Sequence, residues 1–156
     1  MAVDNLLIGA QVAFSISSTN TGFQSVAVSD KIEFVTKPDT SVYNNIITKQ
    51  YSIAASGTQD IDVFEFTNLV REEVEADSVF GIILTVTGAN GECTLSPGPS
   101  NGLDFPDSGD TVIKSGGVYL YFQPTAFPVS NTSKILRLTN SGTGTMTVRI
   151  GIIVGA

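Results

Sequence analysis

The final segment of the chain, residues 145–154, constrains the fold most, because apolar residues recur there at every second position. Successive side chains of an extended strand point to opposite faces, so alternate residues share a face. This period predicts a strand whose one face is buried in a core. The buried face would carry Met146, Val148, Ile150, Ile152 and Val154, and the opposite face Thr145, Thr147, Arg149, Gly151 and Ile153.

Two segments before it show the same period. Proline cannot donate a hydrogen bond to a neighbouring strand, so Pro124 and Pro128 predict that the first of them stops at Gln123. The second is expected at Lys134–Asn140, and the turn that follows, residues 141–144, has the glycines of a tight hairpin. The first segment, residues 118–123, sorts onto two faces, with Val118, Leu120 and Phe122 against Tyr119 and Tyr121.

Alternation predicts further strands at residues 10–17, 26–34, 47–53, 60–66, 79–87 and 92–95. Residues 26–34 form either one long strand or two short ones. In 60–66 the apolar positions change parity, which predicts a bulge near Val63. Residues 79–87 are apolar on both faces and are expected at the centre of a sheet. There, parity groups Phe80, Ile82, Leu84 and Val86.

One short helix is expected at most, at about residues 68–77, where Leu69, Val70, Val74 and Ala76 offer pairs at helical spacing. Loops are expected at residues 36–45 and 96–110. Nine to eleven short strands with little helix predict an all-β fold, an antiparallel β-sandwich that is jelly-roll-like or another Greek key. At 156 residues we expect a single sandwich domain, residues 10–156, after an N-terminal arm at residues 1–9.

The charge balance argues against several partners and chemistries. The formal net charge is −7 and the eight lysines and arginines are dispersed, so neither nucleic acid nor an anionic membrane is an expected partner. Without histidine, Ser-His-Asp and Cys-His catalysis and most zinc sites are excluded. The lone Cys93 alternates with polar neighbours, which favours a small buried side chain over a nucleophile. We expect no catalytic residue, no cofactor and no enzyme.

Carboxylates suggest two other sites. Asp104, Asp107 and Asp110 lie close together in one loop and could bind calcium, although their spacing matches no EF-hand and a solvated acidic turn explains them as well. Asp60 and Asp62 alternate on one strand face. A glycosidase would need two facing carboxylates, and no spacing singles out a pair among Glu33, Glu65, Glu72, Glu73, Glu75 and Glu92.

Aromatic and apolar residues give candidates for a protein interface. Tyr119 and Tyr121 either pack under a second layer of the same domain or anchor a contact between subunits. The long loop, the proline corner and the N-terminal arm supply the other candidates, which are Phe105, Phe127, Leu6 and Leu7.

The C-terminal third resembles small virion proteins of tailed bacteriophages. The shared pattern is a glycine turn, an aromatic and aliphatic strand, a proline corner, a strand ending in Asn-Ser-Gly and a Val/Ile-rich last strand. Here these are Ser115–Gly117, Val118–Gln123, Pro124–Val129, Lys134–Gly142 and Val148–Gly155. Weaker similarity extends back through residues 51–53, 59–62 and 79–87. This chain departs by Phe127 where tryptophan is frequent and by the segment 68–77.

The resemblance implies a β-sandwich that decorates or cements a capsid by binding the major capsid protein, as a homo-oligomer. Such a protein would be made in the host bacterial cytoplasm and would end on the capsid exterior, in keeping with an N-terminus that lacks a signal sequence. The alternative is a tail- or fibre-associated module that attaches to a host by binding a surface glycan. A hydrolase with an unrecognised carboxylate pair is a third.

Overall fold

The computed structural model of the chain describes residues 8–18, 26–36, 45–67, 73–88, 91–105 and 109–155. Within these residues every regular element is a β-strand, and adjacent strands pair antiparallel. The twelve strands are β1 (Ile8–Ser18), β2 (Val26–Thr36), β3 (Asn45–Ile53), β4 (Thr58–Asp62), β5 (Glu65–Thr67), β6 (Glu73–Glu75), β7 (Ser78–Gly88), β8 (Glu92–Pro97), β9 (Thr111–Lys114), β10 (Val118–Pro128), β11 (Ile135–Asn140) and β12 (Met146–Gly155).

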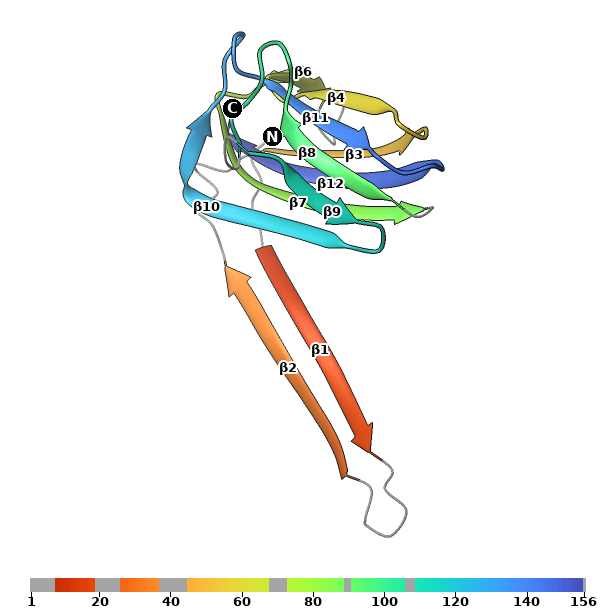
Figure 1. Cartoon of the computed structure of the whole chain (residues 1–156). Coiled ribbons are helices and arrows are strands. Elements are labelled where there is room, and N and C mark those ends of the chain that lie inside the picture. The colour runs from red at the N-terminus through yellow and green to blue at the C-terminus, as the bar shows by residue number, and fades with distance from the viewer. Residues whose placement is uncertain are drawn as a thin grey trace.

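Eight of these strands form a β-sandwich of two four-stranded sheets, with the orders β10-β7-β12-β3 and β4-β11-β8-β9 (Figure 1). We call them the first and the second sheet. Along the chain, the first of the eight strands pairs with the last, the second with the seventh, the third with the sixth and the fourth with the fifth. This is the strand order of a jelly roll, so the expected all-β sandwich is confirmed.

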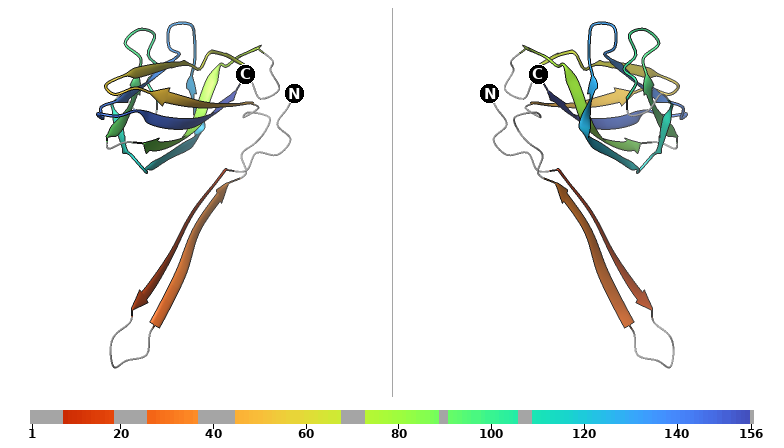
Figure 2. Two further views of the ribbon diagram at one scale, coloured as in Figure 1. Left: turned by 90° about the vertical axis from the view of Figure 1, so that its right-hand side faces the viewer. Right: turned by 90° about the vertical axis from the view of Figure 1, so that its left-hand side faces the viewer.

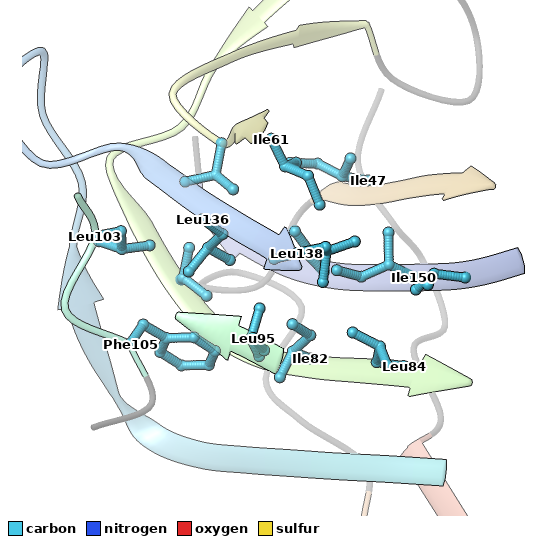
Figure 3. Close-up of a cluster of buried hydrophobic side chains, with 14 of the residues drawn as sticks. Ile47, Ile61, Ile82, Leu84, Leu95, Leu103, Phe105, Leu136, Leu138 and Ile150 are labelled. Atoms are coloured by element: carbon cyan, nitrogen blue, oxygen red, sulfur yellow. The ribbon is translucent and has the colours of Figure 1, made fainter. Parts of the chain in front are cut away.

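The core lies between the two sheets and is almost entirely apolar (Figure 3). The last strand supplies the face predicted from its period, with Met146, Val148, Ile150, Ile152 and Val154 all at most 3% exposed. Opposing side chains come from β8 and β11, where Leu95, Leu136 and Leu138 are also buried. Burying about 25 cal/mol per Å² of apolar surface makes this layer the main source of stability.

The central strand β7 departs from simple alternation. Phe80 is predicted on the face of Ile82, but it lies in a separate cluster on the opposite side of the sheet. The register explains this: Gly81 pairs with Ile153 and Val79 with Val154, so β12 has no residue opposite Phe80. The extra residue is a β-bulge, and it reverses the faces on one side of it.

Two predicted strand boundaries are wrong. Strand β10 does not stop at Gln123 but continues to Pro128, and pairing with β7 resumes at Phe127 after an irregular stretch. Because β10 is at the edge of its sheet, a proline there need not donate to a second neighbour. Residues 60–66 are not one bulged strand either. The Asp62 carboxylate accepts hydrogen bonds from the backbone N–H groups of Phe64 and Glu65, at 2.9 and 3.2 Å, and the chain leaves the sheet there.

The short helix expected at about residues 68–77 is not found where the chain is described. Residues 68–72 lie outside the described residues, and Glu73–Glu75 form strand β6, in which Val74 pairs with Phe66 of β5. The sequence Glu-Val-Glu has period two and a β-branched centre, so pairing with β5 overrides a weak helical pattern.

Strands β1 and β2 form a hairpin of their own and pair with no strand of the sandwich. In Figures 1 and 2 the hairpin extends away from the sandwich. The sandwich strands therefore begin at Asn45, later than the boundary at residue 10 suggested by the sequence, and residues 26–36 form one long strand. Of the expected arm, residues 1–7 lie outside the described residues, and Ile8 and Gly9 begin β1.

Candidate functional site

The outer face of the first sheet carries the largest exposed hydrophobic side chains found together among the described residues. On β10, Tyr119 and Tyr121 pack on the core, which leaves Val118 and Leu120 pointing away from it. Val118 is 65% exposed and Leu120 38%. Strand alternation forces this outcome, because turning the tyrosines inward turns the aliphatic residues outward.

The neighbouring strand β7 adds a third exposed residue. Ile83 is 44% exposed and pairs with Leu120 on one side and with Gly151 of β12 on the other. Gly151 leaves no side chain beside Ile83, and an added Cβ there would come within 3.0 Å of Ile83 Cγ2. Val118, Leu120 and Ile83 thus form a continuous surface feature, which we call the apolar stripe. A clustered apolar surface of this kind marks an interaction site.

The outer face changes character along the strands. Toward the start of β7 it is covered, since Phe80 and Ile153 are buried together with Ile46, Phe122 and Ala126 packed against them. Toward the other end it becomes polar, with Thr87, Thr147 and Ser52. Between these ends Arg149 donates a hydrogen bond from Nε to Gln50 Oε1 at 2.8 Å.

Arg149 is the charged residue that β12 places on this face, next to Thr85 of β7 in the register. Together with Lys49, Ile83 and Gly151 it lines a shallow groove of ≈ 560 Å³. The face therefore offers apolar contact area beside the positive charges of Arg149 and Lys49.

The aromatic interface candidates face the core side of β10, three of them on that strand and Phe105 in the loop between β8 and β9. Phe105 is 1% exposed, so as an interface residue it is a wrong prediction. Its ring contacts Tyr121 edge-on at 5.4 Å and Phe127 edge-on at 4.8 Å between centroids. Tyr119, Tyr121 and Phe127 are partly buried against the core. The tyrosines therefore follow the alternative in which they pack within their own domain. Leu6 and Leu7 lie outside the described residues.

The sequence did not predict that Val118, Leu120 and Ile83 lie on the surface. The alternation of β10 was visible, but it did not tell which of its two faces would be covered. Large aliphatic side chains are usually buried, and tyrosine hydroxyl groups can hydrogen-bond to water, so both tendencies favour the opposite arrangement. Tyr121 resolves this by donating its hydroxyl to Gln123 Oε1 at 2.8 Å, which leaves the ring against Phe105.

The structure describes two of the three aspartates that were predicted as calcium ligands. Asp104 and Asp110 are exposed, and Asp107 lies outside the described residues. Among the residues that are described, no cluster of three metal-ligating side chains occurs. Asp60 and Asp62 each have a cationic partner instead. Arg137 donates to both oxygens of Asp60, at 2.6 and 2.8 Å, and Lys134 Nζ lies 2.9 Å from Asp62.

Two glutamates do face one another, on the small β5–β6 hairpin. Glu65 pairs directly with Glu75, next to Glu73, and all three are exposed beside an open hollow of ≈ 670 Å³. No buried environment distinguishes one as an acid and the other as a base, which glycoside hydrolysis requires.

Cys93 is fully buried, as predicted, and burial raises the pKa of its thiol to about 11. A thiol without a nearby cation to stabilise the thiolate is a poor nucleophile.

A comparison with models of known protein families and with curated proteins finds no match to this sequence. The surface described above is therefore interpreted from its own geometry.

In the described part of the chain, no helix has the length and apolar character needed to cross a bilayer.

Proposed function

We propose that this chain is a structural protein of a virion, a decoration or cement protein that stabilises a bacteriophage head by binding the major capsid protein. It acts without catalysis, through contacts of its outer surface with other proteins. The observation that carries the proposal is the apolar stripe of Val118, Leu120 and Ile83, whose side chains stay exposed on the outer face of the first sheet. A stable sandwich with such a face is suited to assembly.

Two further features support it. The segment that resembles phage virion proteins, residues 115–155, includes β10, β11 and β12, and β10 carries two of the three stripe residues. The jelly roll recurs in viral capsid domains, which is an argument by analogy of fold. The net charge of −7 suits the capsid exterior better than the DNA-filled interior.

The glycan-binding alternative gains less from the geometry. It relied on exposed tyrosines as platforms for sugar rings, but Tyr51, Tyr119 and Tyr121 are packed against the core. Tyr43 lies outside the described residues.

The experiment compares virions made with and without this chain. Virions lacking it should lose their DNA at lower temperature and lower salt, and added purified protein should restore their resistance. Val118→Asp protein should restore it poorly, because a charge on the apolar stripe must be desolvated on binding. Val112→Asp is the matched control, since Val112 is 53% exposed but lies on β9 of the second sheet.

Virions without the chain that are as resistant as complete ones would refute the proposal. So would mass spectrometry of separated particles that finds the chain in tails and not in heads, a result that would favour the attachment alternative.

A further inference from the structure

Strand β10 lies at an edge of the first sheet, yet its composition is that of a central strand. It pairs with β7 on one side, and no described strand pairs with its other side. Among the eight sandwich strands only β7 and β10 carry no charged residue. Strand β7 is enclosed by two neighbours, whereas β10 is open on one side. The first six residues of β10, Val118–Gln123, are therefore an uncharged edge in a chain of net charge −7.

The other three edges of the two sheets carry charges. Lys49 lies on β3, Asp60 and Asp62 lie on β4, and Lys114 lies on β9. Such charges protect an exposed edge, because a further strand that paired with it would have to desolvate them. Strand β10 has prolines for the same purpose, but only from Pro124 onward. Its first six residues thus remain open to pairing.

The backbone of this edge is oriented for such pairing. On β7, Val86 donates its N–H to the Gly117 carbonyl at 3.1 Å and accepts from the Gly116 N–H at 2.8 Å. Hydrogen-bonded and non-hydrogen-bonded pairs alternate along an antiparallel ladder. Leu120 pairs with Ile83, an odd number of residues from Val86, and so occupies a non-hydrogen-bonded position. Its N–H and C=O therefore point away from β7, toward the open edge.

We propose that the edge of β10 pairs with the same edge of a second copy of this chain, antiparallel, about a two-fold axis at Leu120. Leu120 of one copy then lies opposite Leu120 of the other, and the two first sheets join into one continuous sheet. A second copy suits this edge because neither β9 nor β10 carries a carboxylate, so two acidic chains approach here without their negative charges meeting. The apolar stripes of both copies lie side by side on one outer face, which stays available to the partner of the proposed function.

The size of the contact predicts a weak dimer. At about 3.3 Å per residue, six residues span roughly 20 Å. Residues 115–117 connect β9 to β10, so the edges of the two sheets lie on the same side of the sandwich (Figure 1). With sheets about 10 Å apart, this side offers on the order of 400 Å² per copy and 800 Å² in a pair, the size of a transient contact. Copies held next to one another on a particle reach the effective concentration at which such a contact forms.

Opposite charges at one position test the pairing in the full-length chain. Sedimentation equilibrium should show the wild-type protein as a reversible dimer with a dissociation constant between about 10 μM and 1 mM. Leu120→Lys and Leu120→Glu should each weaken self-association by about tenfold or more, because each places two like charges opposite one another. An equimolar mixture of the two variants should recover the dimer, since lysine and glutamate then meet across the axis. A mixture that stays monomeric overturns the proposal, as does a wild-type protein that is monomeric at about 1 mM.

Two further variants on the same face serve as controls. Thr48 lies in the same row of the sheet as Leu120, through Ile83 and Gly151, but on the opposite edge strand β3. Thr48→Lys should therefore leave the dimer intact. Ile83→Lys, one strand inward from the edge, should also have little effect, because edge pairing does not cover that side chain. If Ile83→Lys abolishes the dimer as Leu120→Lys does, the outer faces meet instead of the edges, and the proposal is wrong.

Hydrogen exchange measures the pairing without any substitution, so it decides the question even if a charge at Leu120 disturbs the sandwich. The Leu120 amide should become more protected as the concentration of wild-type protein rises, because its N–H gains a partner in the dimer. The Tyr119 amide, at the neighbouring hydrogen-bonded position, should show protection that is independent of concentration. Leu120 protection that does not change with concentration overturns the proposal. Protection that appears only on adding capsid protein would assign the edge to a strand of that protein, which overturns it as well.

These measurements are independent of the proposed function. If virions lacking the chain were as resistant as complete ones, the virion role would fail and the self-association of the purified protein would be unchanged. Capsid binding by a chain that stays monomeric at every concentration would refute the edge pairing and leave the virion role standing.

Discussion

At the scale of single residues, Asn140 illustrates how a motif acquires a structural meaning. It is the one fully buried polar side chain in the described part of the chain. Its Nδ2 donates to the carbonyls of Ile53, Ala54 and Gly144 at 2.9–3.0 Å, and its Oδ1 accepts from the N–H of Gly142 at 2.8 Å. One side chain thereby joins the β3–β4 turn to the β11–β12 turn. The Asn-Ser-Gly sequence is structural in this fold.

Replacing Asn140 with alanine should lower the free energy of unfolding by about 2–4 kcal/mol, because several buried backbone groups lose their partner. Urea denaturation followed by circular dichroism would measure the change. The matched control is Asn131→Ala, since Asn131 is exposed and its loss should cost less than about 0.5 kcal/mol. Equal effects of the two substitutions would contradict this account.

The ion pair of Asp60 and Arg137 should make stability depend on pH. The hydrogen bonds from Arg137 lower the pKa of the Asp60 carboxyl below its ordinary value of 3.8. A group whose pKa is lowered on folding stabilises the protein above its unfolded pKa, and this contribution is lost as the pH falls through the folded pKa. Asp60→Asn should therefore be less stable than the wild type at neutral pH, and the difference should shrink as the pH falls below 3.8.

Urea midpoints of both proteins across this pH range would test the prediction. High salt at neutral pH should reduce the difference, because the pair is partly exposed and its charges are screened. A stability difference that stays constant from neutral to acidic pH would assign the effect of the substitution to something other than the charge.

At the scale of elements, the bulge in β7 shapes the outer face of the first sheet. It places Phe80 on the outer face. The next residue, Gly81, pairs with Phe122 of β10 on one side and with Ile153 of β12 on the other. A Cβ on Gly81 would come within 2.9 Å of the Tyr121 carbonyl oxygen and of the Phe122 ring. The close approach requires glycine, because a backbone oxygen cannot move aside as a flexible side chain can.

Gly81→Ala should therefore destabilise the protein by about 1–3 kcal/mol, the usual cost of forcing an extra methyl into a packed site. Thermal unfolding would measure it. Gly109→Ala is the control, because no atom lies within 4 Å of an added Cβ there, and its effect should stay within about 0.5 kcal/mol. A neutral Gly81→Ala would mean that β7 and β10 separate at no cost.

At the scale of the whole molecule, the two sheets of the sandwich enclose one continuous core. Segments far apart in the sequence meet around it, since β7 pairs with β12 and β8 with β11, and their side chains point into the same core (Figure 3). Such non-local packing favours cooperative unfolding, in which the core opens as a unit.

Cys93 reports on this cooperativity. Since the thiol is fully buried and its pKa is raised to about 11, the native protein should not react with a thiol-specific chromogenic reagent at neutral pH. Reactivity should appear at the same urea concentration as the loss of circular dichroism. Val112→Cys, at an exposed position, should react at once and serves as the control. Reaction of Cys93 well before global unfolding would show that the second sheet opens separately.

The sequence by itself determined the fold class, most of the long strands and the apolar core face of the last strand. These follow from period-two alternation and from turn chemistry, which are local properties. Alternation also separated Val118 and Leu120 from Tyr119 and Tyr121. The burial of Cys93 and the absence of histidine chemistry were equally readable from the residues alone.

Only the tertiary structure decided the rest. Which face of β10 is covered depends on Phe105, a residue of the loop between β8 and β9 that packs on Tyr121. Three other features depend on which strand lies alongside. They are the bulge at Phe80, the continuation of β10 past Pro124 and the strand at Glu73–Glu75. Pairing between distant segments is set by the total burial and hydrogen bonding of the folded chain, and no local pattern contains that information.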